Sequence, residues 1–395
     1  MKIGILTFHA ASNFGANLQA YSSVCIYRRL GHQVKVINYL RSGDFNYINT
    51  VNAKQFQEHS SFVEESLPIT REVTTPEELL QVVKYEKFDL ISIGADAVWR
   101  LPNDENKLIF FADWLLNEPD HPFVVAMSAA HMGQGFKSLP ETLKKRIKDD
   151  LEKFSFISVR DEWTRKKINE DIIKRNFVKY INPDPVIWLS DFTSELKTPN
   201  DSKFLERPYY LMSLPVRCDG NSKMREWFTT FKYLVNKAGY NLVELPLPEG
   251  ISGLDFDYTI KYPINPLHWF TYIGRARAFC GLRFHAIVSS ISSGTPFFSI
   301  DSYGNQSLFP RVARYLGWYR VGRAFDDKSK IRNLLLGSGF EKYRVSGSII
   351  QISPYKVFDM LEHFDKAKLL AFRKSLRYIY TSTMDLMFES LNNEN

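Results

Sequence analysis

The feature that most constrains the fold of this 395-residue chain is a strand–helix–strand pattern at its N-terminus, which starts again after a polar stretch. Residues 3–6 form a short apolar strand, and residues 16–30 follow with apolar side chains at helical spacing. Gly31 stands where a helix C-cap belongs, and a second strand is predicted over residues 34–38. This pattern predicts a parallel sheet whose ligands collect at the carboxyl ends of its strands.

The alternation continues in two successive runs. The first has further strands predicted over residues 88–93, 123–128, 156–159 and 178–181, and the polar residues 46–72 are predicted to leave the sheet. The second begins after the polar residues 194–208, with strands predicted over 209–214, 242–245, 278–281 and 296–300 and helices over 223–238, 265–275 and 285–293. Asn265-Pro266 is a good N-cap followed by Pro, and Ser353-Pro354 opens a long helical region towards residue 391.

A chain of this length is too long for one ordinary domain. The restart of the alternation predicts an α/β protein with two Rossmann-like domains facing each other across a cleft. We expect an N-terminal domain over residues 1–193 and a C-terminal domain over residues 208–350. The helical segment over residues 353–391 is expected to pack back on the first domain.

Composition narrows the classes of function. The net charge of +7 is spread along the chain, as at residues 144–153 and 165–175, so these runs indicate solvated helix faces first and attraction to anions second. No nucleic-acid signature is present. The three cysteines form no Cys-x-x-Cys pair, and no apolar run is long enough for a membrane span, so we expect a soluble, cytoplasmic protein with at most peripheral membrane contact. No metal-binding motif or Gly-x-Ser-x-Gly hydrolase motif occurs.

Two loops after predicted strands carry candidate ligand-binding residues. In the first, Asn13, Gly15 and Asn17 precede or open a helix whose free N–H groups attract an anion or a sugar hydroxyl, although a structural turn explains them equally well. In the second, Asp96 and Trp99 follow an apolar strand and present a carboxylate and a stacking surface. The alternative there is that Asp96 caps the next element and that Trp99 lies in the core.

Two further candidates are cationic. Arg160 directly follows a buried strand, and the alternative to a functional role is a surface arginine paired with Asp161 or Glu162. Arg283 and His285 lie together at a strand-to-helix turn, where the helix dipole favours a negative ligand. A single histidine on a helix is more often structural, but an arginine two residues away at such a turn favours a functional role.

Taken together, these segments resemble the polysaccharide pyruvyl transferase family. The resemblance spans about the first 310 residues, with the motifs in family order. It runs through Asn13-Phe-Gly-Ala-Asn-Leu-Gln-Ala-Tyr21, Ile93-Gly-Ala-Asp-Ala-Val-Trp99, Ile157-Ser-Val-Arg160, Asp184-Pro-Val186 and Arg283-Phe-His-Ala286 with Gly294-x-Pro296. The chain departs from the family at Ala97, where Gln is common, and at Tyr303-Gly304-Asn305, where many members carry a Lys.

The resemblance implies a GT-B-like fold, phosphoenolpyruvate as donor, and a nucleotide- or lipid-linked sugar acceptor of a cell-surface polysaccharide. It implies that Arg160 and Arg283 clamp the donor, with Phe284 beside them, and that His285 is the acid/base. The remaining candidates for lining the cleft are Asn13, Gly15, Asn17, Asp96, Trp99 and His131.

Such a reaction is a transfer of the enolpyruvyl group onto two sugar hydroxyls as a cyclic ketal, and it requires no metal or redox cofactor. Arginine forks suit the phosphate and carboxylate of the donor, and a histidine suits proton transfer near neutral pH. Two alternatives stay open at this point: a GT-B glycosyltransferase that uses a nucleotide sugar, for which the Asp301 region is compatible, and a non-catalytic sugar- or anion-binding protein of the same fold.

Overall fold

A computed structural model describes residues 1–40, 52–100, 108–131, 136–194, 206–301 and 328–394. The chain divides into two compact units. Unit 1 comprises Met1–Asn46, His59–Trp188 and Ser375–Asn395, and unit 2 comprises Tyr47–Glu58 and Leu189–Lys374. Within the polar stretch in which the sequence predicts the boundary, residues 195–205 lie outside the described residues.

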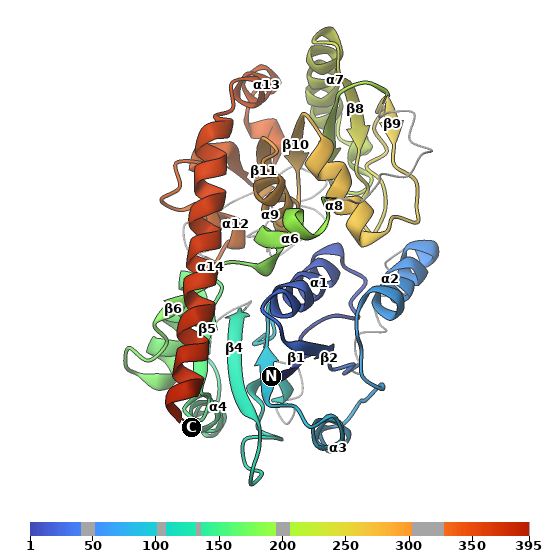
Figure 1. The fold of residues 1–395 in the computed structure, drawn as a ribbon. Helices are drawn as coiled ribbons and strands as arrows, with labels where there is room; N and C mark the ends of the chain where they lie inside the picture. The colour runs from blue at the N-terminus through green and yellow to red at the C-terminus, as the bar shows by residue number, and fades with distance from the viewer. Residues whose placement is uncertain (41–51, 101–107, 132–135, 195–205, 302–327, 395) are drawn as a thin grey trace. The chain divides into compact units, whose positions relative to one another are not determined.

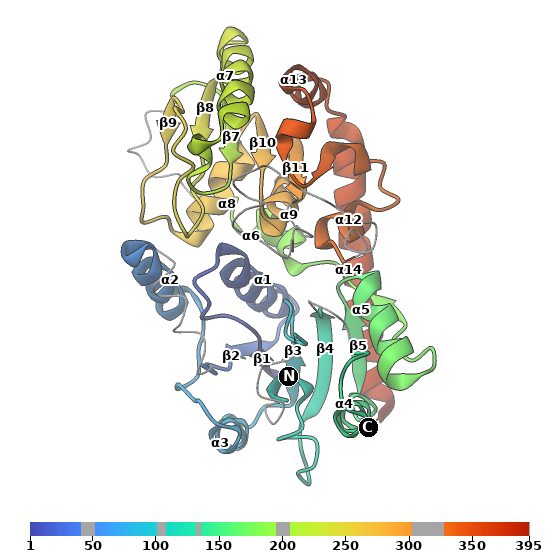
Figure 2. The same cartoon turned by 180° about the vertical axis from the view of Figure 1, so that it is seen from behind.

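Unit 1 contains a parallel sheet. In the described part of the chain this sheet has the strand order β2-β1-β3-β4-β5-β6 (Figure 1). Its strands and helices are β1 (Lys2–Leu6), α1 (Phe14–Arg29), β2 (Gln33–Val36), α3 (Pro76–Glu86), β3 (Leu90–Ile93), β4 (Phe123–Ala129), α4 (Glu141–Leu151), β5 (Phe156–Val159), α5 (Glu162–Lys167) and β6 (Tyr180–Ile181). A π-helical turn (Ile168–Ile173) continues α5, and short 3₁₀ turns occupy Ile109–Phe111 and Pro185–Trp188. Figure 2 shows α5 beside the strand β5 that it follows.

Unit 2 contains a second parallel sheet, with the strand order β12-β11-β10-β7-β8-β9 among the described residues. Its strands and helices are α6 (Leu189–Phe192), β7 (Tyr209–Ser213), α7 (Ser222–Lys237), β8 (Asn241–Glu244), β9 (Tyr258–Thr259), α8 (Pro266–Arg275), β10 (Ala278–Gly281), α9 (Phe284–Ser293), β11 (Phe297–Asp301), α12 (Lys330–Leu335), β12 (Arg344–Ser346) and α13 (Pro354–Glu362). Helices α2 (Ala53–Ser66) and α14 (Lys366–Glu394) contribute residues to both units.

The predicted α/β class with two parallel sheets is therefore confirmed, and so are most local signals. Asn13 caps α1 with its side-chain oxygen, Asn265 caps α8, and Gly31 and Gly294 have φ values of +84° and +76° at helix ends. Two segments are more detailed than the sequence predicted. The described part of residues 46–72 contains the helix α2, and the predicted C-terminal helical region consists of two helices, α13 and α14, with a break at residues 363–365.

Buried carboxylates in unit 1 give a testable stability prediction. Burial, together with the charge of Asp113, raises the pKa of Asp150 from 3.8 to about 6. The folded state therefore binds this proton more tightly than the unfolded state, so the stability that the protonated group contributes is present at pH 3.8 and is lost as pH rises through 6. The loss amounts to at most about 3 kcal/mol, and to less after solvent screening.

We expect Asp150→Asn, which mimics the protonated form, to match the wild type near pH 4 and to melt at a higher temperature near pH 8. Melting curves of both proteins across this range measure the difference. A difference that does not change with pH would show that the Asp150 carboxyl does not titrate as described.

Candidate functional site

The loop between β1 and α1 holds its polar side chains in different surroundings. Asn13 is exposed, and its Oδ1 accepts the N–H of Gly15 at 2.8 Å. Asn17 is fully buried: its Nδ2 donates to the carbonyl of His9 at 2.8 Å, and its Oδ1 lies 2.6 Å from Nδ1 of His59. Burial lowers the pKa of His59 to about 4, so its ring is neutral near pH 7. Asn17 thus holds the loop together, and Asn13 is the side chain that faces solvent.

The turn after β3 places the side chains of Asp96 and Trp99 in different surroundings. Asp96 has a φ of +74° and accepts the N–H of Ala97 on its Oδ1 at 2.7 Å. Trp99 has no exposed surface, donates its Nε1–H to the carbonyl of Phe110 at 2.8 Å, and stacks on Phe111 at 5.7 Å. The structure therefore places Trp99 in the core, as in the alternative weighed above, and it has no face available to a sugar.

His131, which follows β4, is also in the interior of unit 1. Its Nδ1 lies 2.9 Å from the carbonyl oxygen of Trp99, its ring stacks on Phe136 at 4.3 Å between centroids, and its backbone N–H donates to Thr164 Oγ1. Its exposed fraction is 4%. These contacts fix the ring against the core of this unit.

Arg160 lies directly after β5, and the surface ion pair considered above is wrong for it. The side chain is 3% exposed, and its Nη1 lies 3.2 Å from Asp184 Oδ2 and 3.9 Å from Asp96 Oδ1. Asp161 instead caps α5 by accepting the N–H of Thr164, and Glu162 binds Arg165 at 2.6 and 2.7 Å. Arg160 is a buried cation between two carboxylates.

In unit 2, the turn between β10 and α9 carries the Arg-Phe-His motif. Arg283 precedes α9 with a φ of +85°, a strained conformation for a residue with a Cβ, and such strain is common at functional sites. Phe284 is nearly buried, and its ring lies 5.1 Å from that of His285 at 79°. His285 is partly exposed in the first turn of α9, so the motif presents an arginine and a histidine where helix N–H groups favour an anion.

Close packing of the backbone fixes this turn. A Cβ at Gly281, the last residue of β10, would lie 2.5 Å from the carbonyl oxygen of Ser213 on the neighbouring strand β7. Only glycine allows the two backbones to approach this closely. The turn that carries Arg283 and His285 therefore starts from a position that packing determines.

Two residues beside this motif were not found from the sequence. The Glu249 carboxylate binds Nη2 of Arg283 at 2.5 Å, and both side chains are about two-fifths exposed. The ammonium group of Lys330, at the start of α12, lies 6.0 Å from the centre of the Phe284 ring. Both are distant from the motif in sequence, so no local pattern connects them with it.

The acidic residue Asp301 has an internal role. It is 1% exposed, it accepts a hydrogen bond from Ser329 Oγ, and Arg344 Nη1 lies 2.6 Å from its Oδ2. Two positions were noted above at which the sequence departs from the family. Ala97, which follows Asp96, is buried, and residues 303–305 lie outside the described residues. Within the described parts of the chain, no group of three or more His, Cys, Asp or Glu residues is arranged to hold a metal ion.

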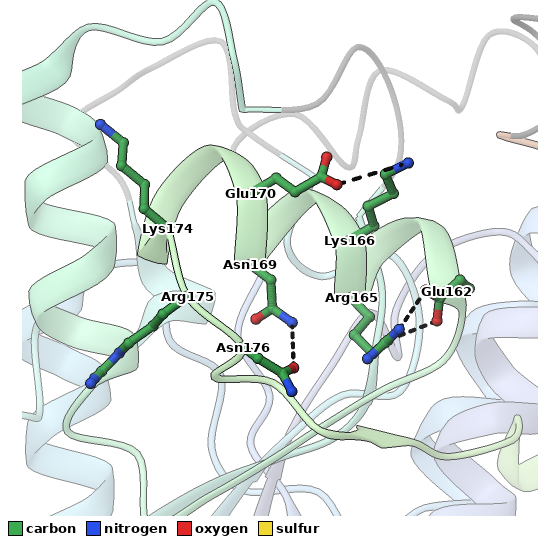
Figure 3. Close-up of a pocket in the computed structure, with 8 residues that line it drawn as sticks. All are labelled: Glu162, Arg165, Lys166, Asn169, Glu170, Lys174, Arg175 and Asn176. Atoms are coloured by element: carbon green, nitrogen blue, oxygen red, sulfur yellow. Dashed lines mark hydrogen bonds and ion pairs between the residues drawn. The ribbon is translucent and has the colours of Figure 1, made fainter.

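A separate depression of about 790 Å³ lies on the surface of unit 1 along α5 and the π-helical turn (Figure 3). Three of the cations that line it pair along and beside the helix: Arg165 with Glu162, Lys166 with Glu170 at 3.8 Å, and Arg175 with Glu152. It contains none of the predicted site residues. The pairing fits the solvated helix face expected for residues 165–175.

Comparisons with known proteins give the family. The family model described as polysaccharide pyruvyl transferase matches residues 13–303. No curated protein matches the chain. Of the described residues, none form a helix long and apolar enough to cross a membrane.

Among solved structures, the chain is similar to the glycosyltransferase SnogD from Streptomyces nogalater, with 12% identity over 99% of both chains and a TM-score of 0.45. It is also similar to UDP-GlcNAc 2-epimerase from Methanocaldococcus jannaschii, with 10% identity over 95% of this chain and 92% of that one and a TM-score of 0.48. The family match covers most of the sequence and includes every motif described above. This chain therefore belongs to the polysaccharide pyruvyl transferase family.

Proposed function

We propose that the protein transfers the enolpyruvyl group of phosphoenolpyruvate onto two hydroxyls of a sugar as a cyclic ketal. The observation that carries the proposal is the turn before α9, where an exposed arginine and a partly exposed histidine flank a helix N-terminus within three residues. Family membership supports the same reaction. The acceptor is a sugar of a cell-surface polysaccharide or of its nucleotide- or lipid-linked precursor.

The donor requires cations because it carries a phosphate and a carboxylate. The guanidinium of Arg283 can bind either group through two parallel N–H bonds, and the N–H groups of the first turn of α9 favour the same negative charge. Arg160, from unit 1, is the second donor-binding residue in this proposal. Two arginines are a suitable complement for a ligand with two anionic groups.

The proposed reaction needs a proton at carbon. His285 donates a proton to the methylene carbon of the donor, which gives an oxocarbenium-like centre at the adjacent carbon. One sugar hydroxyl adds there, the C–O bond to phosphate breaks with its electron pair, and the second hydroxyl closes the ring. Of the two hydroxyl protons, one replaces the proton that His285 gave away and the other leaves with hydrogen phosphate.

Ligand-dependent melting tests the proposal directly. At a concentration of 100 times its Kd, a ligand that binds only the folded state stabilises it by about 2.7 kcal/mol. We expect phosphoenolpyruvate to raise the Tm in this way, and phosphate release to require a nucleotide- or lipid-linked hexose from a panel of acceptors. A response to nucleotide sugars with none to phosphoenolpyruvate would identify a glycosyltransferase instead, and sugar binding without phosphate release would identify a binding protein.

The Glu249–Arg283 ion pair gives a further prediction. The Glu249 carboxylate occupies the guanidinium that the donor carboxylate or phosphate would bind, so the two compete for the same N–H donors. An exposed pair of this kind contributes up to about 1 kcal/mol, so Glu249→Gln is expected to lower the Kd for phosphoenolpyruvate about two- to fivefold. Asp255→Asn, which removes the acid of another exposed ion pair in unit 2, controls for net charge. Weaker binding in Glu249→Gln would show that Glu249 assists the donor rather than competing with it.

A further inference from the structure

Two side chains from distant segments of the chain meet at the carboxylate of Asp184. Its Oδ2 accepts a hydrogen bond from Gln19 Nε2 at 2.5 Å and one from Arg160 Nη1 at 3.2 Å. The same Nη1 lies 3.9 Å from Asp96 Oδ1. Gln19 is in α1 and Arg160 follows β5, so two elements of unit 1 converge on the carboxylate of Asp184, and Asp96, which follows β3, lies on the other side of the contact, against Arg160.

The backbone around Asp184 is fixed before any ligand arrives. Ser128 Oγ donates to the carbonyl of Pro183 at 2.7 Å, and Asn182 Nδ2 donates to Ser128 Oγ at 2.9 Å. On the other side, the N–H of Val186 donates to Asp184 Oδ1 at 3.1 Å. The carboxylate is 2% exposed, so its position is set by the strand β4 and by its own turn rather than by solvent.

The cluster of Arg160, Asp184 and Asp96 is not a simple binding site for anions, because it contains two acidic side chains. Arg160 lies against both of them. Two carboxylates beside a cation weaken its attraction for a third anion. A guanidinium, however, has five N–H donors in a rigid plane, and a carboxylate that binds one edge fixes the direction of the others.

We propose that Asp184 is the positioning residue of Arg160: the carboxylate, held by Gln19 and by its own turn, orients the guanidinium for the donor anion. The inference rests on the proposed function and deepens it. Asp184 itself touches no donor atom in this arrangement. Gln19 acts indirectly: its amide holds the Asp184 carboxylate in place, and this carboxylate orients Arg160.

Electrostatics and positioning predict opposite results for Asp184→Asn. Removal of a negative charge beside Arg160 makes the surroundings more positive, and electrostatics alone would then tighten the binding of phosphoenolpyruvate. Loss of the charge-assisted bond removes one constraint on the orientation of the guanidinium, and positioning predicts weaker binding. We expect the Kd and KM for phosphoenolpyruvate to rise at least tenfold, with kcat changed much less. Unchanged or tighter binding would overturn the proposal.

A double-mutant cycle separates positioning from general damage to the fold. If Asp184 acts through Arg160, then Asp184→Asn adds little to the rise in Kd that Arg160→Lys already causes. Independent damage predicts that the two effects multiply, and that result would also overturn the proposal. Asp150→Asn is the matched control, since it is the same substitution at a buried carboxylate of unit 1, and it should leave the Kd unchanged. Should Asp184→Asn not fold, Gln19→Met removes one bond to the same carboxylate and is expected to raise the Kd in the same direction.

The free energy of unfolding of the wild type, the two single variants and the double variant can be measured without any ligand. If Asp184 holds Arg160, the two substitutions are also non-additive in the free energy of unfolding, and additive effects would contradict the contact itself. Failure of the wild type to bind phosphoenolpyruvate would overturn the proposed function and the donor-binding part of this inference. The stability cycle would still decide whether Asp184 orients Arg160.

Discussion

Replacement of His285 by alanine is expected to lower kcat about 10²- to 10⁴-fold, the usual contribution of a positioned general acid or base. Neither arginine is changed, so the Kd for phosphoenolpyruvate should rise far less. The helix should persist, because His285 lies in its first turn and alanine is the strongest helix former. Single-turnover phosphate release and a melting curve on one preparation measure both quantities.

His268→Ala is the matched control for this variant. His268 is a partly exposed histidine of α8, which packs against α9 in the same unit, and burial lowers its pKa. Its loss should leave turnover per folded molecule close to that of the wild type. If His285→Ala loses stability but keeps its turnover, His285 is a structural histidine. His9 and His131, the other histidines on loops after strands, are buried, and neither then becomes an accessible substitute.

Replacement of Arg283 by lysine is expected to raise the Kd for phosphoenolpyruvate about 10- to 100-fold. A hydrogen bond to a charged group contributes about 1.5–3 kcal/mol, and lysine keeps the charge but loses the two parallel N–H bonds. Backbone strain at φ +85° is the same for both residues because each carries a Cβ, so the comparison isolates the side chain.

Isothermal calorimetry with phosphoenolpyruvate measures the affinity of Arg283→Lys. Arg225→Lys, at an exposed arginine of α7, is the control for a general loss of guanidinium groups in unit 2. Equal affinity in Arg283→Lys and the wild type would remove Arg283 from the donor site and leave the positive φ at this position without a functional explanation.

The sequence predicted best the strands and helix ends that are determined by residues close together along the chain. Residues 278–281 form the strand β10 as expected, because they are apolar and end in Gly281, and helix α8 begins at the predicted Asn265-Pro266 cap. Helix α2 was missed, because residues 53–66 are mostly polar and show weak periodicity.

Contacts between distant segments could not be predicted in this way. The alternative to a functional role for Arg160 placed its partner next to it in sequence, at position 161 or 162. The partner is Asp184, 24 residues further on, and the Gln19 side chain that shares this carboxylate lies 165 residues before it. Trp99 is another example, since its burial depends on Phe110 and Phe111, and Phe110 lies 11 residues further along the chain. Residue type identified the candidates, and the fold determined which of them reach solvent.

The close approach of β10 to β7 has a consequence for mutagenesis of this turn. A Cβ at Gly281 would lie 2.5 Å from the carbonyl oxygen of Ser213, so any larger residue there would force the two strands apart. Arg283 and His285, two and four residues later, would move with the end of β10. A substitution at Gly281 would therefore disturb the turn without removing either of its polar side chains.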